Sequence, residues 1–295
     1  MKYNMDKGAL TNIDMKQTKY KILYWSIFAT LLIFGFLICV FPVVWVVLSG
    51  FKDANEIYNT TGSLWPKSID LGKIAEVWNS MKFYKYYANT FIIAGGDVLF
   101  TIVVCGVAGF VLSKVKPMGH KFIFAALFTL TLMPSTGRIV PQYMTFKDFP
   151  YLHINMLNTY WPMWLMAASN IFNMILFKNF FDGISSTLVE AARIDGASDI
   201  RIFFKIILPM SAPIFWVVGL FTFNNALGSF FWPYLLIQDN ELLPLGVQIY
   251  KLKTSTYSVD YQLLALLFSM LPQIIIFAVF QKRIMGGLNA GAVKG

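Results

Sequence analysis

The sequence predicts an all-α integral membrane protein with six transmembrane helices. Of its 295 residues, 57% are hydrophobic and 13% are charged, and the mean hydropathy is +0.60. Soluble domains carry roughly 25% charged residues, so a water-soluble fold could not cover this much apolar surface. The apolar residues form long runs, and Lys and Arg fall mainly in the polar segments between them. That distribution is typical of a multi-pass membrane protein.

Six apolar runs are candidates for crossing a bilayer whose hydrocarbon core is about 30 Å thick. The first run follows a polar, basic segment at 1–21, and it continues too far for a cleavable signal peptide. Pro134 marks a kink or an end in the third run, and Asn and Pro residues interrupt the fourth. The predicted spans are about 22–49, 88–113, 121–139, 155–178, 211–237 and 261–281.

Basic side chains predict how these spans are oriented. More of the 24 Lys and Arg residues lie in segments on the N-terminal side of the membrane than in the loops on the other side. The positive-inside rule then places both termini in the cytoplasm, in the segments 1–21 and 282–295. The transmembrane domain is 22–281, and its loop at 182–209 faces the cytoplasm. The net charge of +9 is therefore a topology signal, and no nucleic-acid partner is expected.

The cytoplasmic loop contains a charged stretch, 190–209, that is broken by a glycine. Thr187 and Glu190 fit a capping box at the start of a helix, and Gly196 is placed to end it. Ser198 can cap a second short helix, after which Pro209 opens the fifth span. From these residues alone, an amphipathic connector and a docking site for a partner are equally good interpretations.

Half of the positions of this stretch match a known pattern. The matching residues are Glu190, Ala191, Ala192, Asp195, Gly196, Ala197, Phe203, Ile206, Leu208 and Pro209. The stretch resembles the EAA loop of ABC-importer permeases. The last nine residues, 287–295, resemble the C-terminal tail of the second permease of carbohydrate importers, the maltose-permease G-type subunit. The run at 230–233 resembles a Phe-x-Trp-Pro segment late in the fifth helix of that family.

The resemblance implies the type I ABC importer permease fold and a subunit that takes up sugar, with oligosaccharides as the expected cargo. It implies a multi-pass protein of the bacterial plasma (inner) membrane that works with an ATPase subunit dimer, a second homologous permease subunit and an extracytoplasmic sugar-binding protein. The loop, including Arg193, would couple to the ATPase. Gly291, Val293 and Lys294 of the tail would contact the same ATPase.

Several residues are candidates for lining a translocation pathway. Asp97 lies within the second run, where a carboxylate is costly and faces either a cavity or a partner. A pathway role, a place near the outer interface and pairing with a neighbouring subunit all stay open. Where the family often carries Trp-Asn before the Phe, this chain has Leu227 and Gly228. The candidate pathway residues are Asp97, Asn224, Asn225, Gly228 and Phe230.

The sequence has no motif for bond-making chemistry. No GxxxxGK[ST] phosphate loop, GxSxG or HExxH motif occurs, and two Cys with two His are too few for a typical zinc site. We therefore expect no enzymatic activity, no cofactor and no metal in this chain, with ATP hydrolysed on a separate subunit. The alternative is an ATP-independent secondary transporter or channel, which would predict internal repeats with broken helices. The EAA-like segment occurs only once.

Overall fold

The computed structural model describes residues 18–59, 63–252 and 256–292, and in these ranges every regular element is a helix. The described chain forms two compact units. Of the described residues, unit 1 comprises those up to Ile74 together with Ser258–Leu267, and unit 2 comprises those of Ala75–Tyr257 and those from Phe268 onward. The predicted all-α fold is confirmed for the described residues.

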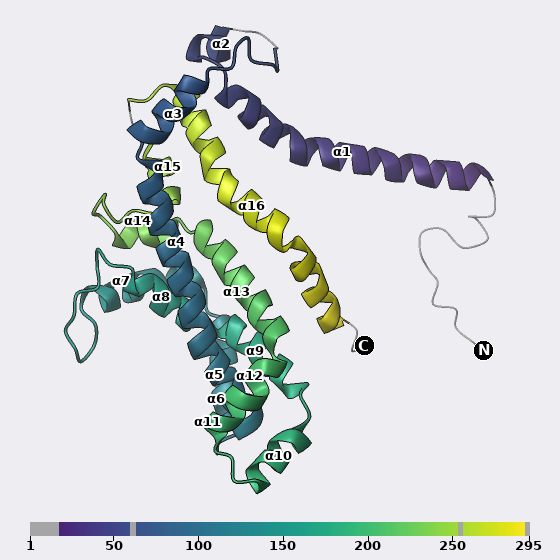
Figure 1. The fold of residues 1–295 in the computed structure, drawn as a ribbon, viewed down its shortest axis with the longest axis vertical. Coiled ribbons are helices and arrows are strands. Elements are labelled where there is room, and N and C mark those ends of the chain that lie inside the picture. The colour runs from purple at the N-terminus through teal and green to yellow at the C-terminus, as the bar shows by residue number, and fades with distance from the viewer. Residues whose placement is uncertain (1–17, 60–62, 253–255, 293–295) are drawn as a thin grey trace. The chain divides into compact units, whose positions relative to one another are not determined.

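Unit 1 is built on helix α1, Thr18–Gly50, which contains the predicted first span (Figure 1). Its apolar side chains are exposed along most of its length, as for Leu31 at 65% and Phe36 at 64%. Exposed apolar area of this extent is unfavourable in water, so lipid or another apolar surface must cover the helix. The short helix α2, Ala54–Asn59, follows it.

A buried ion pair joins two further helices within unit 1. Helix α3, Leu71–Ser80, carries Lys73, and the first turn of α16, Val259–Ala292, carries Asp260. The Lys73 Nζ atom lies 2.6 Å from the Asp260 Oδ2 atom, and each side chain is only 7% exposed. Lys73 also donates a hydrogen bond of 2.8 Å to the backbone carbonyl of Lys52.

Unit 2 contains the second predicted span, which is longer than the 88–113 expected. It forms one continuous apolar helical stretch over Phe83–Val115. Two π-helical turns interrupt the regular α-helical hydrogen bonding. In order, the segments are α4 (Phe83–Phe100), a π-turn (Thr101–Cys105), α5 (Gly106–Phe110) and a second π-turn (Val111–Val115).

The third predicted span is bent, and a second bend lies where the charged loop meets the fifth predicted span. The third has a bend of 100° between His120–Thr131 and Ser135–Lys147, consistent with the kink predicted at Pro134. The second bend, of 80°, lies at Ser211, next to Pro209. The helices involved are α6 (His120–Thr131), α7 (Ile139–Lys147), α11 (Asp199–Ile202), α12 (Leu208–Met210) and α13 (Ala212–Leu227).

Two predicted spans end differently in the structure. The fifth was expected to continue to residue 237, but α13 ends at Leu227 and a separate helix α14, Phe231–Leu236, follows a break at Gly228 and Ser229. The fourth, 155–178, is divided into α8, Trp161–Ala168, and α9, Ile171–Asp182. Asn170 caps α9 by accepting a hydrogen bond from the Asn173 backbone N–H, which stabilises the break.

By length and composition, the described residues contain three helices that could cross a membrane, or up to five if each bent pair is one span. The three are α1, the stretch through α4 and α5, and the part of α16 up to Gln281. The fourth predicted span is not among them because neither α8 nor α9 is long enough alone. The short helix α15, Leu245–Leu252, precedes α16.

The core of unit 2 lies where α5, α9 and α13 meet. Phe177, Phe181, Ile207 and Val218 are fully buried in one apolar cluster. Gly109 allows α5 to approach α9 closely, since a Cβ atom there would lie 2.7 Å from the Phe177 Cβ. Farther along the same unit, α4 packs against both α8 and α13 (Figure 1).

Candidate functional sites: a polar cavity and a charged loop

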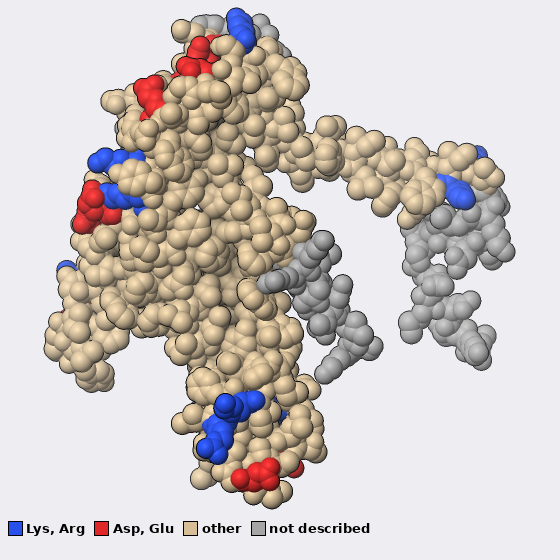
Figure 2. Space-filling model, viewed as in Figure 1, with Lys and Arg blue, Asp and Glu red and all other residues tan. Residues whose placement is uncertain are grey.

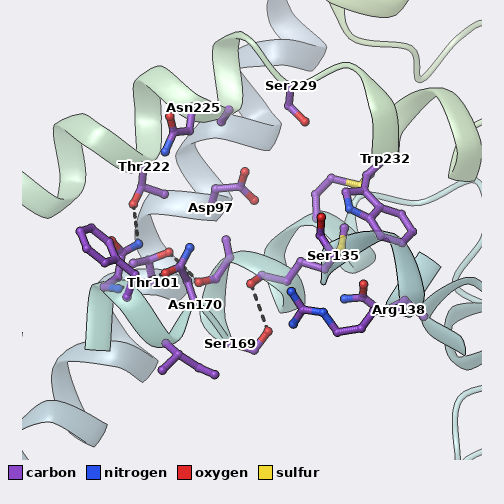
Figure 3. A pocket seen from close by; sticks show the side chains of 18 of the residues that line it. Asp97, Thr101, Ser135, Arg138, Ser169, Asn170, Thr222, Asn225, Ser229 and Trp232 are labelled. Atoms are coloured by element: carbon purple, nitrogen blue, oxygen red, sulfur yellow. Dashed lines mark hydrogen bonds between the residues drawn. The ribbon is translucent and has the colours of Figure 1, made fainter. Parts of the chain in front are cut away.

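A cavity of about 730 Å³ lies among the broken helices of unit 2 (Figure 3). Its walls come from α4, α6 to α9, α13 and α14, and they combine charged, amide and hydroxyl side chains with aromatic rings. The polar lining residues are Asp97, Thr101, Thr131, Ser135, Arg138, Gln142, Ser169, Asn170, Asn173, Thr222, Asn225 and Ser229. This size and mixture of groups fit a small-molecule site.

Asp97 lines this cavity from α4 as a nearly buried carboxylate. The residue is 9% exposed, and its Oδ1 atom is buried without a hydrogen-bond partner among the described residues. The preceding Gly96 has no room for a Cβ atom, which would overlap the Trp164 indole. That glycine therefore lets α8 approach α4 beside Asp97.

Other polar groups of the cavity wall bond to one another. The Asn173 side-chain amide donates to the Thr222 hydroxyl at 3.3 Å, which joins α9 to α13. The Thr101 hydroxyl donates to the backbone carbonyl of Ala167 at 3.1 Å, which joins the first π-turn to α8. These bonds hold the walls together, whereas the Asp97 carboxylate points into the space between them (Figure 3).

The structure divides the candidate pathway residues between several places. Asp97 and Asn225 line the polar cavity, and Asn224 lines a separate, mostly apolar cavity of about 210 Å³. Gly228 lies at the end of α13, and the Phe230 ring contacts the rings of Tyr234 and Tyr250 with centroid distances of 5.2 and 4.8 Å. None of Asn224, Gly228 and Phe230 belongs to the wall of the polar cavity.

Sequence reasoning missed the place of Arg138 at this cavity, together with Ser169 and Asn170 at the α8–α9 break and Asn173 in α9. Arg138 is exposed and makes no ion pair among the residues that the structure describes. The interruption of the fourth apolar run by Asn170 and Asn173 was the available signal for the α8–α9 break.

The charged loop forms the expected pair of short helices at one end of unit 2 (Figure 1). The first is α10, Ser186–Ile194, and it carries Glu190, Ala191, Ala192 and Arg193. The predicted capping box is wrong: Thr187 lies inside the helix, and its backbone N–H donates to the hydroxyl of Ser185, the N-cap. Ser185 directly precedes the helix and has non-helical φ and ψ angles, as an N-cap residue requires.

Gly196 ends α10 as predicted. Its φ is +78°, in the left-handed region that favours glycine. Its N–H donates to the Arg193 carbonyl at 3.0 Å, and the Ala197 N–H donates to the Ala192 carbonyl at 2.9 Å, which together form a Schellman motif. Ser198 then caps α11 by accepting from the Arg201 N–H, also as predicted.

The second half of the loop anchors to the core of unit 2. Phe203 is buried, with its ring centroid 5.1 Å from that of Phe110. Leu208 packs at the edge of the same cluster, and Pro209 is exposed. The loop is therefore firmly attached to the membrane helices on its C-terminal side.

Charged side chains connect the loop to the end of the second predicted span. The Arg193 guanidinium pairs with Asp199 at 2.9 Å, so it links α10 to α11. It also donates to the Lys114 carbonyl at 3.5 Å, while the Lys114 ammonium donates to the Ile184 carbonyl at 2.6 Å. Figure 2 shows acidic and basic side chains together at this end of unit 2, separated by a broad uncharged belt from the next charged group.

Asp182 forms another connection at the end of α9. Its carboxylate accepts hydrogen bonds of 2.6 Å from the Ser113 hydroxyl and from the Lys178 ammonium. Burial acts to raise the pKa of Asp182, but these two bonds and the positive charges of Lys178 and Lys114 outweigh it and lower the pKa.

Exposed apolar side chains lie among the charges of the loop, and sequence reasoning did not single them out. Ile194 is 87% exposed and Ile200 is 72% exposed, and Leu188 is also exposed. Exposed apolar residues within a polar rim mark sites of protein contact. Of the predicted tail residues, Gly291 lies within α16, and Val293 and Lys294 lie outside the described residues.

A polar cavity among apolar helices, in a chain that also carries a charged loop, is typical of a multi-pass membrane transport component. The chain belongs to the family described as binding-protein-dependent transport system inner membrane component, which matches residues 10–286. It is therefore a transport permease of the inner membrane rather than an enzyme.

Known relatives cover nearly the whole chain. It is 28% identical to the diacetylchitobiose uptake system permease protein NgcG of Streptomyces coelicolor, over 90% of this chain and 87% of that one. It is 31% identical to the probable ABC transporter permease protein YurM of Bacillus subtilis, over 89% of this chain and 87% of that one. It is 28% identical to the galactooligosaccharides transport system permease protein GanQ of the same species, over 96% of this chain and 99% of that one.

A solved structure has the same fold. A chain in the crystal structure of a bacterial ABC transporter involved in the import of the acidic polysaccharide alginate aligns with a TM-score of 0.78 and 24% identity. The alignment covers 90% of this chain and 98% of that chain. The expected ABC importer permease fold is thus confirmed.

Proposed function

We propose that this chain is one permease subunit of an ATP-driven ABC importer for saccharides, which an extracytoplasmic binding protein delivers. The observation that carries the proposal is the loop of α10 and α11, which presents Ile194 and Ile200 among charged side chains. Such a surface suits docking on a separate ATPase subunit. Family membership and the oligosaccharide cargoes named for NgcG and GanQ support the cargo class.

The loop is placed to transmit movement to the polar cavity. It follows α9, which contributes Asn173 to the cavity wall, and precedes α13, which contributes Thr222. Closure of the ATPase dimer on ATP would favour one arrangement of these helices over another, because ATP binds the two ATPase states with different affinity. The cavity then serves as part of the path that cargo follows between the two subunits of the permease.

The proposal includes a topology and a set of partners. The α10–α11 end faces the cytoplasm together with both chain termini, as the positive-inside rule predicts. A second homologous permease supplies the other half of the path. The C-terminal residues Gly291, Val293 and Lys294 reach the ATPase, and Glu190, Ala191, Ala192, Arg193, Asp195, Gly196 and Ala197 form the coupling surface.

Charge reversal and helix disruption in the loop test this function. In the reconstituted transporter, we expect Glu190→Lys or Gly196→Pro to abolish ATPase activity stimulated by the loaded binding protein, and to abolish transport. Both variants should still insert in the membrane, since neither changes a span. Asp148→Lys, a reversal at an exposed carboxylate outside the loop, is the matched control and should retain activity. Normal stimulated activity in both loop variants would rule out the coupling role.

A further inference from the structure

The Asp97 carboxylate has no hydrogen-bond or ion-pair partner among the described residues, although Arg138 lines the same cavity. Asp97 is 9% exposed, its Oδ1 atom has no hydrogen-bond partner, and no basic side chain forms an ion pair with it. A carboxylate removed from water without partners is strongly unfavourable. Groups of this kind inside membrane proteins are retained where a ligand or a partner pairs with them.

The position of Asp97 favours a ligand over a packing role. Its side chain points into the cavity of about 730 Å³ rather than into the packed contacts of α4 with α8 and α13 (Figure 3). Because Gly96 has no side chain, the Trp164 indole of α8 lies against the α4 backbone at this position. The indole fills the space that a side chain at residue 96 would occupy. This arrangement leaves Asp97 at the cavity wall, with its Oδ1 atom buried and the residue 9% exposed.

The remaining cavity groups fit a polyhydroxyl molecule. The Asn173 and Thr222 side chains are hydrogen-bonded to each other. Asn225 and Gln142 have no such bond among the described residues, so their amides are more available to bind a ligand. Trp232 adds an aromatic wall. Sugars are bound in this way, with hydroxyl groups on polar side chains and apolar ring faces on aromatic ones.

We propose that Asp97 recognises cargo directly, by accepting hydrogen bonds from donor groups of a saccharide in this cavity. The inference rests on the proposed function and gives this subunit its own part in choosing cargo. A hydroxyl or ammonium substituent satisfies the carboxylate, and an ammonium does so with a charge-assisted bond. A saccharide that offers only acceptors at that position leaves Asp97 unpaired, which is unfavourable.

A matched set of ligands and variants tests the contact. The probes are cellotriose, chitotriose and tri-N-acetylchitotriose, which differ only in carrying hydroxyl, amine or acetamide groups on the same backbone. Equilibrium binding of the radiolabelled probes is measured on the assembled transporter in nanodiscs, without ATP or binding protein, in neutral buffer. The wild-type protein should bind chitotriose about tenfold more tightly than cellotriose.

Asp97→Asn should abolish that preference, because the amide keeps the shape but removes the charge. Asp148→Asn removes an exposed carboxylate outside the cavity and should leave the preference intact. An unchanged preference in Asp97→Asn would overturn the inference, as would the absence of saturable binding of all three probes to the wild-type protein. The latter result, or equal binding of all three, is expected if Asp97 pairs with the second permease subunit instead.

This measurement is independent of coupling to the ATPase. A transporter that binds the probes as expected but shows no effect of Glu190→Lys on ATPase activity would refute the coupling proposal alone. A transporter that loses coupling in Glu190→Lys but has no Asp97-dependent preference would refute the cargo contact alone.

Discussion

Lys73 and Asp260 form an ion pair in which both side chains are almost fully removed from solvent, at 7% exposure each. The pair joins α3 to the start of α16 in unit 1, two segments far apart in the sequence. A buried pair of this kind contributes little net stability compared with an apolar pair, but the loss of one partner leaves the other charge buried alone.

Replacement of either partner should therefore be more damaging than replacement of both. We expect Lys73→Met or Asp260→Leu alone to destabilise the protein by about 3–5 kcal/mol. The double variant should recover most of that loss, because it leaves neither charge unpaired. Thermal unfolding of the purified transporter followed by tryptophan fluorescence measures all three, and additive losses in the double variant would contradict the prediction.

The hydrogen bonds of Asp182 predict a dependence of stability on pH. Because the pKa of Asp182 is lowered in the folded protein, its contribution is present above the ordinary carboxyl pKa of 3.8. That contribution is lost as the pH falls through the lowered native value. Asp182→Asn should cost about 1 kcal/mol near neutral pH, given that the side chain is 40% exposed.

The difference in unfolding temperature between wild type and Asp182→Asn should shrink in acid. Asp148→Asn is a control, since Asp148 lies in an exposed pair with His153. A difference that stays constant from neutral to strongly acidic pH would show that the carboxylate charge does not stabilise the end of α9.

Substitution by alanine should change stability differently at two glycines of α5. A Cβ atom at Gly109 would lie 2.7 Å from the Phe177 Cβ and 3.0 Å from the Lys178 backbone nitrogen, so Gly109→Ala should destabilise unit 2 by about 1–3 kcal/mol. At Gly106 the nearest atom is a Phe215 ring carbon at 3.5 Å, an ordinary contact. Gly106→Ala should be neutral or slightly stabilising in the same unfolding assay.

The apolar side chain of Ile194 gives a prediction that is independent of charge. Ile194→Ser should reduce ATPase activity stimulated by the binding protein about tenfold, as expected for loss of a contact at the centre of an interface. Thermal stability should not change, because the residue is 87% exposed. Met118→Ser, at a residue that is 100% exposed outside the loop, should leave activity unchanged. Equal losses in both variants would argue against a specific role for Ile194.

The sequence predicted the elements whose signals are local. Long apolar runs located α1 and α16, Gly196 located the end of α10, and Ser198 located the cap of α11. Each depends on residues within a few positions of one another. The start of α10 was misjudged because Ser185 and Thr187 both suit an N-cap, and only the backbone conformation decides between them.

The cavity could be predicted only in part because its wall is assembled from distant segments. Asp97 was conspicuous as a carboxylate in an apolar run, and Asn225 as an amide near the end of another. Arg138 and Thr222 carry no such local signal, since their place at the cavity depends on the bend after α6 and on the packing of α13 against α4. Periodicity in one segment does not determine which face of it meets another.

The 80° bend at Ser211 turns the chain sharply between the charged loop and the cavity wall. On one side lies the short segment Asp199–Met210, which follows α10 in the chain, and on the other lies α13 with Thr222 and Asn225. Because the two segments meet at nearly a right angle, a displacement along the short segment would act across the axis of α13 rather than along it. Under the proposed function, coupling at the loop would then change the width of the cavity through a sideways movement of α13.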